Sequence, residues 1–498
     1  MGSKPSRIPA ILAAILTAVA YYYGTGLHPH WYMTWLAPLP ILFLAPRVGR
    51  WTLWLAAFLA FAAGGANMAA YMTKVAPVPI IILAIFGPSL LFAWFVLIFR
   101  RFVVRGQLIR ATFALPSLWV AWEYLSELAS PHSTFGNLAY SQLDCLPILQ
   151  LASLTGIWSI SFLLFLFPST IAVLVAPPVT DGVPPPCHSS IVARVGYRQS
   201  LALVVAVIFV SVLIYGELRL KNTPQGSTVT IGLLNSDQPH IRFEKGSAAI
   251  EVIRNYVARI PALAQQGAQF VVISEKSIRL DDSNIAQIDQ LLAQSARDNH
   301  LTIVIGVQHM PNLNESRVYS PEPSATPQFT PSATYEKHHM LPAFESDLLP
   351  GTTRTLLNER FGIAGLTICK DMDFPALSRQ YGNDHASLLL VPAWDFVDDG
   401  WLHGRMAILR GVESGFAIAR SARMGILTLS DNRGRVIAEK TTGASDFDTL
   451  VGTLTVHQET TLYDHLGDWF AWLNLAIAAI LLFLPNRRRS EQEKVPSP

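Results

Sequence analysis

Long apolar segments dominate the first 220 residues of the chain, and one more follows residue 468. A helix that crosses a bilayer needs about 20 mostly apolar residues, and these segments reach or approach that length. The pattern therefore predicts seven membrane spans followed, much later, by an eighth. The expected spans are Ile8–Tyr23, Trp31–Ala45, Trp51–Tyr71, Val78–Phe99, Ile109–Tyr124, Ile157–Val175, Leu201–Tyr215 and Trp469–Leu484.

A different pattern fills residues 226–457, where short β-rich runs alternate with helical periodicity. Such alternation predicts an α/β domain whose sheet is covered by helices and whose chemistry lies at strand ends. The expected strands are Thr228–Leu234, Phe270–Ile273, Thr302–Val307, Phe361–Ile368, Ser387–Val391 and Gly425–Leu429. The expected helices include Ala248–Gln266, Ile285–Asn299 and Leu402–Ser414.

These patterns divide the chain into an N-terminal membrane domain (1–220), an α/β domain (226–457), a C-terminal transmembrane helix (469–484) and a basic tail (485–498). Two proline-rich stretches, 177–199 and 311–334, are predicted to be a cytoplasmic linker and a flexible outer loop. The first apolar segment is read as an uncleaved anchor, although Ala18–Ala20 also resembles a signal-peptide cleavage site.

Charge orients the predicted spans. The chain is 51% hydrophobic and only 14% charged, which is too apolar for an ordinary soluble enzyme. With a cytoplasmic N-terminus, the inner loops and the tail receive fourteen Lys and Arg residues, whereas the short outer loops receive only Lys74. Cytoplasmic loops of membrane proteins are enriched in Lys and Arg. The bias therefore places residues 226–457 on the outer, extracytoplasmic side of the membrane.

Three ionisable residues follow predicted strands or loops in this outer domain. Glu275 comes soon after Phe270–Ile273, Lys337 lies 62 residues later, and Cys369 ends the run Phe361–Ile368 after another 32 residues. Spacing alone does not make a site, because a lone Cys is more often a buried apolar residue. Likewise, Glu275 beside Lys276 could be a solvated ion pair, and Lys337 a surface charge.

The segments around these residues resemble the nitrilase superfamily. They are Val271–Glu275, Tyr335–Pro342 and Gly365–Cys369, in the order in which that superfamily carries its Glu, Lys and Cys. The resemblance implies an αββα sandwich. It also implies that Glu275 is a general base, Lys337 stabilises an oxyanion, and Cys369 is a nucleophile that forms a thioester.

Seven spans before such a domain and one after it resemble the apolipoprotein N-acyltransferase family. Phe135–Gln142, Gln150–Ala152 with Gly156, and an auxiliary Glu at Glu345 fit the same family. The resemblance implies transfer of a fatty acyl chain from a phospholipid to the N-terminal amine of a diacylglyceryl-cysteine lipoprotein. It further implies a monomer in the bacterial inner membrane, with the catalytic domain on the periplasmic side and no cofactor.

The chain departs from the family pattern at two places. Lys370 and Asp371 stand after Cys369 where the family has Tyr and Glu, and Val391–Phe396 replaces an Asn-Asp-Ala-Trp-Phe segment. We expect substrate contacts from Lys370, Asp371, Trp394 and Glu123, and Lys370 could lower the pKa of the thiol or contact a phosphate. Alternatively, Lys370 points to solvent and Glu123 simply extends toward the membrane surface.

Other chemistry is not indicated. His338, His339, His385 and His403 lack the spacing of a zinc site, so no metal is expected, and no basic face or phosphate loop suggests nucleic acid. Two alternatives to the lipoprotein acyltransferase stay open. One is a membrane-tethered amidase, or an N-acyltransferase for another amine. The other is a membrane protein or transporter whose outer domain only binds a ligand.

Overall fold

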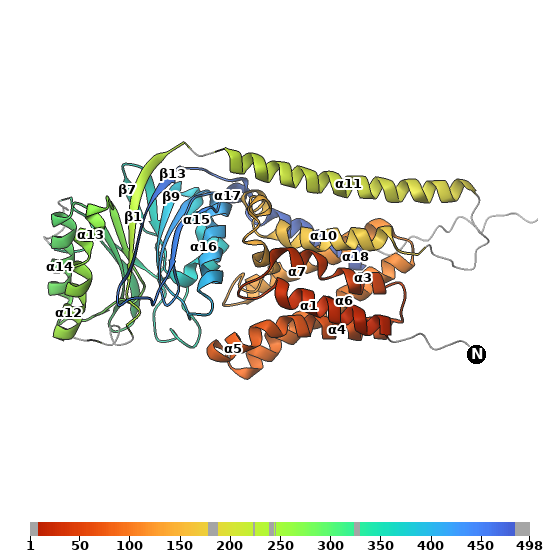
Figure 1. Ribbon diagram of the computed structural model, residues 1–498, viewed down its shortest axis with the longest axis horizontal. Helices are drawn as coiled ribbons and strands as arrows, with labels where there is room; N and C mark the ends of the chain where they lie inside the picture. The colour runs from red at the N-terminus through yellow and green to blue at the C-terminus, as the bar shows by residue number, and fades with distance from the viewer. Residues whose placement is uncertain are drawn as a thin grey trace, which may run out of the picture.

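The computed structural model describes residues 8–177, 188–222, 225–238, 244, 246–322 and 329–483, with side chains of 188–196 excluded. Two parts follow each other along the long axis: a bundle of helices at one end and a sandwich of two β-sheets at the other (Figure 1). The proline-rich part of the predicted linker and the basic tail lie outside the described residues.

Helices form at every apolar segment of the bundle, but two segments are interrupted. The second segment splits into two short helices at Pro38, and the third bends through a 3₁₀ turn at Ala66–Met68. The last helix before the sandwich starts at His188, so the predicted linker 177–199 is in part helical. The helices are α1 (Ile8–Gly24), α2 (Trp31–Leu36), α3 (Leu39–Leu44), α4 (Arg50–Gly65), η1 (Ala66–Met68), α5 (Ala69–Val75), α6 (Val78–Val104), α7 (Leu108–Ala129), α10 (Trp158–Leu174), α11 (His188–Lys221) and α18 (Trp469–Phe483).

Three helical stretches of the described chain are long and apolar enough to cross a membrane: Arg50–Val75, Val78–Val104 and Tyr197–Lys221. Five apolar helices are shorter. Large apolar side chains such as Leu83 and Leu203 are 66% exposed on the outside of the bundle. An apolar outer surface of this kind is typical of a bundle that contacts lipid.

The connection between α7 and α10 is compact and buried. It contains the turn η2 (Leu138–Gln142) and the short helices α8 (Leu146–Leu149) and α9 (Ala152–Thr155). Asn137 stabilises the start of η2, because its side-chain oxygen accepts a hydrogen bond from the amide of Ala139 at 2.9 Å. This connection faces the sandwich.

The sandwich contains two mixed sheets, each with parallel strands at its centre. The first has the order β13-β1-β2-β4-β5-β6, with β3 also paired to β4, and the second has the order β12-β11-β10-β9-β8-β7. Strands β1, β2 and β4 are parallel to one another, and so are β8, β9 and β10. The strands are β1 (Ser227–Asn235), β2 (Phe270–Ile273), β3 (Arg279–Leu280), β4 (Thr302–His309), β5 (Leu313–Tyr319), β6 (Ala333–Glu336), β7 (Leu356–Glu359), β8 (Gly362–Leu366), β9 (Ala386–Trp394), β10 (Ala417–Arg423), β11 (Ile426–Ser430), β12 (Val436–Thr441) and β13 (Asp448–Val456).

Helices cover the outer face of each sheet, which confirms the predicted αββα arrangement. Helices α12 (Gly246–Val257), α13 (Ile260–Gln265) and α14 (Ile285–Asp298) lie on the first sheet. Helices α15 (Pro375–Asn383) and α16 (Gly400–Ser414) lie on the second sheet, between it and the helical bundle (Figure 1). Because α16 packs on the sheet and also on the bundle, it joins the two parts. The short helix α17 (Leu462–Leu466) leads to α18.

The predicted flexible loop 311–334 is wrong in part, because Leu313–Tyr319 forms strand β5 inside the first sheet. Flanking prolines and polar residues obscured this strand. Its polar residues Asn314, Glu315 and Arg317 are nevertheless buried in hydrogen bonds and ion pairs rather than solvated. Sequence patterns assign polar residues to solvent, so a strand that carries buried charges looks like a loop.

Candidate active site

The fold brings Glu275, Lys337 and Cys369 to one end of the sandwich. Glu275 follows β2 and Lys337 follows β6 in the first sheet, whereas Cys369 follows β8 in the second. The Lys337 ammonium donates a hydrogen bond to Glu275 Oε1 at 2.8 Å. Glu275 and Lys337 are each 2% exposed. The alternatives of a solvated Glu275 and a surface Lys337 are therefore wrong.

Glu345 supplies a second carboxylate to the same ammonium. Lys337 Nζ lies 2.8 Å from Glu345 Oε2, which also accepts the Leu341 amide, and Lys276 forms an ion pair with Glu345 Oε1. Asn314 on β5 bridges the two carboxylates, since its Nδ2 donates to Glu275 at 2.6 Å and to Glu345 at 2.9 Å. Two carboxylates, two ammonium groups and one amide thus form a connected and largely buried network.

Electrostatics keep this network charged. Burial alone lowers the pKa of Lys337, but the carboxylates of Glu275 and Glu345 outweigh it and raise that pKa well above its usual value. Burial likewise opposes ionisation of Glu345, whereas Lys337 and Lys276 lower the pKa of this carboxyl to about 2. Lys337 is therefore a fixed cation near neutral pH, which is the state needed to stabilise a developing oxyanion.

Cys369 occupies a strained position at the start of the turn η4 (Cys369–Asp373). Its backbone φ is +44°, a left-handed conformation that residues other than glycine rarely adopt. Such strained residues cluster at functional sites. The thiol donates to the Trp394 carbonyl oxygen, with Sγ at 3.3 Å. Burial raises the pKa of the thiol and Glu275 raises it further, while Lys337 lowers it. The resting sulfur is consequently a neutral thiol that needs a base.

Asp371 holds the nucleophile turn in place. One of its oxygens accepts the Tyr335 hydroxyl at 2.7 Å and the Ile368 amide at 3.0 Å, and the other accepts the His339 amide at 2.9 Å. Asp371 is fully buried. With both oxygens engaged within the protein, Asp371 joins the turn to the segment after Lys337 rather than facing a substrate.

Lys370 does not point to solvent, since it is only 5% exposed. Its ammonium lies 3.1 Å from His132 Nδ1, in the loop after α7, and 3.3 Å from Asp373 Oδ2. Burial and the Lys370 charge lower the pKa of His132 to about 4, so this imidazole is neutral and can accept from Lys370. The residue after the nucleophile is therefore tied to the helical bundle.

A second polar network lies behind Trp394, and sequence reasoning missed it. Arg420 on β10 donates two hydrogen bonds to Asp395, one of them at 2.9 Å. His403 on α16 lies 3.5 Å from Asp395 and 3.4 Å from Asp399, and these carboxylates overcome its burial and raise its pKa to about 9. Ligand atoms of the two Asp and of His403 all lie within 4.8 Å of one another, a grouping that could hold a metal ion. Because Arg420 already neutralises Asp395, an ion-pair network accounts for this arrangement.

The helical bundle reaches into this second network through α5. The Tyr71 hydroxyl donates to Asp399 Oδ2 at 2.6 Å, and Lys74 forms an ion pair with Asp398. Asp399 Oδ1 in turn accepts the Phe396 amide at 2.8 Å, which fixes the loop that follows β9. Tyr71 and Lys74 lie 328 and 324 positions before their partners, so no local motif could have indicated these contacts, whereas Asp395, Asp399 and His403 lie close together in the sequence.

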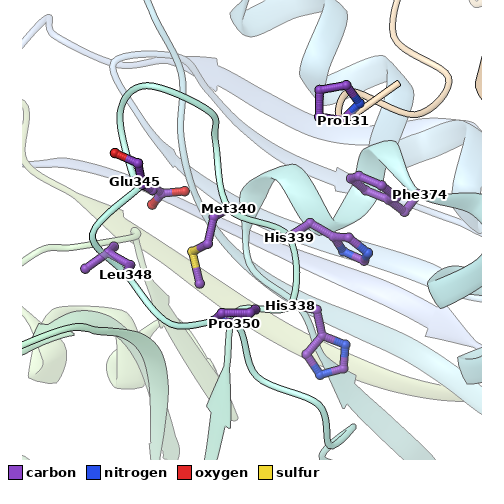
Figure 2. Close-up of a pocket in the computed structure, with 9 residues that line it drawn as sticks. Pro131, His338, His339, Met340, Glu345, Leu348, Pro350 and Phe374 are labelled. Atoms are coloured by element: carbon purple, nitrogen blue, oxygen red, sulfur yellow. The ribbon is translucent and has the colours of Figure 1, made fainter. Parts of the chain in front are cut away.

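Two cavities lie near these residues. The first, about 410 Å³, is bounded by the loop after Lys337, with Pro131 and Phe374 on its far side. Figure 2 shows Glu345 on this loop and His339 facing Phe374, whereas His338 points away from Glu345 and Phe374. The second cavity, about 330 Å³, lies among helices of the bundle and is lined in part by Glu123.

Comparison with known proteins matches both parts of the chain. The family model for the apolipoprotein N-acyltransferase N-terminal domain matches residues 13–170, and the carbon-nitrogen hydrolase model matches residues 238–462. An apolipoprotein N-acyltransferase from Geobacter metallireducens is 23% identical over 97% of this chain and 95% of its own length. One from Chlorobaculum tepidum is 22% identical over 98% of this chain and 97% of its own length.

Among solved structures, an amidase from Nesterenkonia sp. is 17% identical and covers 51% of this chain and 98% of its own length, with a TM-score of 0.39. The two family models fall on the helical bundle and on the sandwich respectively. Since the relatives match the chain along nearly its whole length, the chain belongs to the apolipoprotein N-acyltransferase family.

Proposed function

We propose that the protein moves a fatty acyl chain from a phospholipid, by way of a thioester on Cys369, to the N-terminal amine of a diacylglyceryl-cysteine lipoprotein. The observation that carries this proposal is the buried ammonium of Lys337 held between Glu275 and Glu345 beside a strained Cys369. Base, cation and nucleophile are the groups that acyl transfer requires. The matched family is the second support.

In the first half-reaction, Glu275 takes the proton from the Cys369 thiol and the sulfur attacks the ester carbonyl of the phospholipid. Lys337, together with the backbone N–H of Lys370, stabilises the oxyanion of the tetrahedral intermediate. The intermediate collapses, the carbon–oxygen bond breaks, and Glu275 returns its proton to the departing lysophospholipid alcohol. The products are a thioester on Cys369 and a lysophospholipid.

In the second half-reaction, the neutral amine of the lipoprotein attacks the thioester carbonyl. Glu275 takes the proton that the amine loses, Lys337 again stabilises the oxyanion, and the carbon–sulfur bond breaks. The proton then returns from Glu275 to the sulfur of Cys369, so an amide leaves and the enzyme is restored. Glu345 takes no proton in either step, because its low pKa keeps it charged. Its role is to orient Lys337.

Both substrates are lipids, and the location of the site fits this. The active-site end of the sandwich faces the helical bundle through Lys370, Asp399 and Asp373, each bonded to a residue of the bundle. We place the bundle in the bacterial inner membrane and the sandwich on the periplasmic side, as the positive-inside bias predicts. We further propose that a monomer is active, because Glu275, Lys337 and Cys369 already meet within a single sandwich.

The substrate contacts are also part of this proposal. Trp394 borders the nucleophile through its carbonyl, and Glu123 lines the cavity among the helices. Lys370 and Asp371 act instead through the position of the turn, because their polar atoms contact His132, Asp373, Tyr335 and His339. The departure from the family pattern after Cys369 therefore concerns support of the nucleophile.

The acceptor is tested by following the acyl group after it has left the lipid. Purified protein is loaded from a labelled phospholipid, freed of excess lipid, and then given a diacylated lipopeptide with a free N-terminal cysteine amine. We expect stoichiometric triacylated lipopeptide. Discharge to water or to a small amine, with the lipopeptide unchanged, would instead favour the amidase or the N-acyltransferase for another amine.

A further inference from the structure

The cavity among the helices lies beside the nucleophile turn. Thr134, one of its lining residues, donates from Oγ1 to the Asp373 carbonyl at 2.8 Å, and Asp373 ends the turn that Cys369 begins. On the membrane side, Ala84, Ile85 and Pro88 of α6 form part of the lining. A group bound here would therefore lie close to the nucleophile turn and beside an apolar helix of the bundle.

Glu123 is an unusual residue for such a place. It is 5% exposed, and its Oε1 accepts the amide of Leu138 at 2.8 Å. Its other oxygen, Oε2, has no hydrogen-bond partner within the described parts of the chain, although the polar side chains of Ser161, Trp119 and Asn137 lie nearby. Burial of an ionisable side chain within an apolar helix costs free energy. Such residues are therefore rare, and they usually have a charged partner or belong to a functional site.

The protein does not provide that partner in the described residues. The described lining of this cavity contains no Lys, Arg or His. Arg410 contacts Tyr140 of the lining at 3.3 Å, but its charge is already paired with Glu413 at 3.1 Å. The described lining therefore offers Glu123 no cationic partner, and a ligand that carries a cation could supply one.

The rest of the lining fits a small organic cation. Trp119, Trp122, Phe61 and Phe135 contribute aromatic rings, whose faces attract ammonium groups. Ser126 and Ser133 add hydroxyl groups that can accept hydrogen bonds from an ammonium. A volume of about 330 Å³ accommodates a headgroup rather than a whole lipid.

We infer that Glu123 binds the primary ammonium group of a lipid in this cavity. This inference rests on the proposed function and adds to it the chemical group that is recognised. Two lipids could carry the ammonium: an ethanolamine phospholipid as acyl donor, or the lipoprotein acceptor before its amine loses a proton. In either case Glu123 is a binding residue that takes no part in bond cleavage.

The test compares lipid headgroups at fixed acyl chains, with full-length protein in lipid nanodiscs. Donors are phosphatidylethanolamine, its N-acetylated form and phosphatidylglycerol, of which only the first carries an ammonium. The readout is the rate at which Cys369 gains an acyl group, followed by mass spectrometry. If the donor is recognised, phosphatidylethanolamine reacts about tenfold faster than the other two, and Glu123→Gln removes this advantage so that the three donors react at similar rates.

A second arm concerns the acceptor. If the ammonium belongs to the lipopeptide, Glu123→Gln raises the lipopeptide KM about tenfold with little change in kcat, and all donors react alike. In wild-type protein, an unreactive N-acetylated lipopeptide, used as a competitor, should then bind about tenfold more weakly than the lipopeptide with a free amine. This comparison, like that of the three donors, needs no variant and can overturn the inference even if Glu123→Gln fails to fold.

Two results separate the inference from the function on which it rests. Equal rates from all three donors, together with undiminished competition by the N-acetylated lipopeptide, would overturn the role of Glu123 while the acyltransferase stands. A Glu123→Gln variant that slows the reaction of every donor by the same factor, with the lipopeptide KM unchanged, would show that Glu123 only positions the Leu138 amide. No acyl adduct from any donor would reject both.

Discussion

The Tyr71 hydroxyl donates a 2.6 Å hydrogen bond to Asp399, joining helix α5 of the bundle to the loop that follows β9. Both residues are buried. The same loop begins just after Trp394, whose carbonyl accepts the Cys369 thiol. Tyr71 on helix α5 of the bundle thus supports the loop that follows β9. Through this loop it supports the Trp394 carbonyl, which orients the nucleophile Cys369.

Replacing Tyr71 by Phe removes this hydrogen bond and little else. A hydrogen bond to a charged group contributes about 1.5–3 kcal/mol, so we expect acyl-enzyme formation to slow several-fold. Because the effect is on the position of the nucleophile, kcat should fall while the KM for phospholipid changes little. Thr73→Ala, at an exposed position on the same helix, is the matched control and should behave as wild type. A rise in KM at constant kcat would assign Tyr71 to lipid binding instead.

Glu345→Gln removes one of the two carboxylates that contact Lys337. The ammonium then keeps Glu275 as a partner, but its orientation is lost and Lys276 is left without its buried partner. We expect thioester formation to fall at least tenfold, corresponding to about 1.4 kcal/mol. Asp347→Asn, an exposed change in the same loop, tests whether loss of any acid there has this effect. Equal losses in the two variants would show that Glu345 has no special role.

The pKa of Cys369 provides a direct test of the charges around it. Burial and Glu275 raise this pKa, so alkylation by iodoacetamide should require a more alkaline pH than for a free thiol. Glu275→Gln removes a negative charge and should shift the alkylation midpoint to lower pH, even though turnover is lost. Lys337→Met removes a cation and should shift it upward. Peptide mass spectrometry distinguishes Cys369 from the half-buried Cys145. Shifts in the opposite directions would contradict the arrangement.

Gly306 on β4 is required by close packing under Glu275. A methyl group at this position would lie 2.6 Å from the Glu275 Cα and 2.8 Å from the Ser274 carbonyl oxygen. Gly306→Ala should therefore lower the free energy of unfolding by about 1–3 kcal/mol and reduce activity, because Glu275 must move. At Gly49, an added methyl group meets no atom within 4 Å. Gly49→Ala should leave both quantities unchanged, and a Gly306→Ala protein with normal stability and activity would exclude the packing constraint.

The alternation of strands and helices predicted the α/β domain, and the resemblance to the nitrilase superfamily predicted the sandwich. Glu275, Lys337 and Cys369 were singled out by that resemblance, because their positions after strands and loops did not by themselves distinguish a site from buried or surface residues. Asn314, by contrast, was hidden in a stretch whose prolines and polar residues resemble a loop. Its strand is polar because it carries the network between the two carboxylates.

Contacts between the two parts of the chain could not be predicted at all. Tyr71 and Asp399 are 328 positions apart, and nothing in their neighbourhoods marks either residue. Lys370 illustrates the same limit: its place beside the thiol suggested a headgroup contact, but His132 in the bundle takes its hydrogen bond. Such pairings depend on how two separately folded parts meet, which periodicity and local motifs do not encode.

The central claim is that Cys369 carries the acyl group, and peptide mass spectrometry of the lipid-treated protein tests it most directly. Full-length protein is incubated with a phospholipid of defined acyl chains, digested and mapped. The account predicts a mass gain of one acyl chain on Cys369 that hydroxylamine removes, and no gain in Glu275→Gln protein over the same time. Absence of the adduct in wild-type protein, or its appearance on Cys145 instead, would contradict the account.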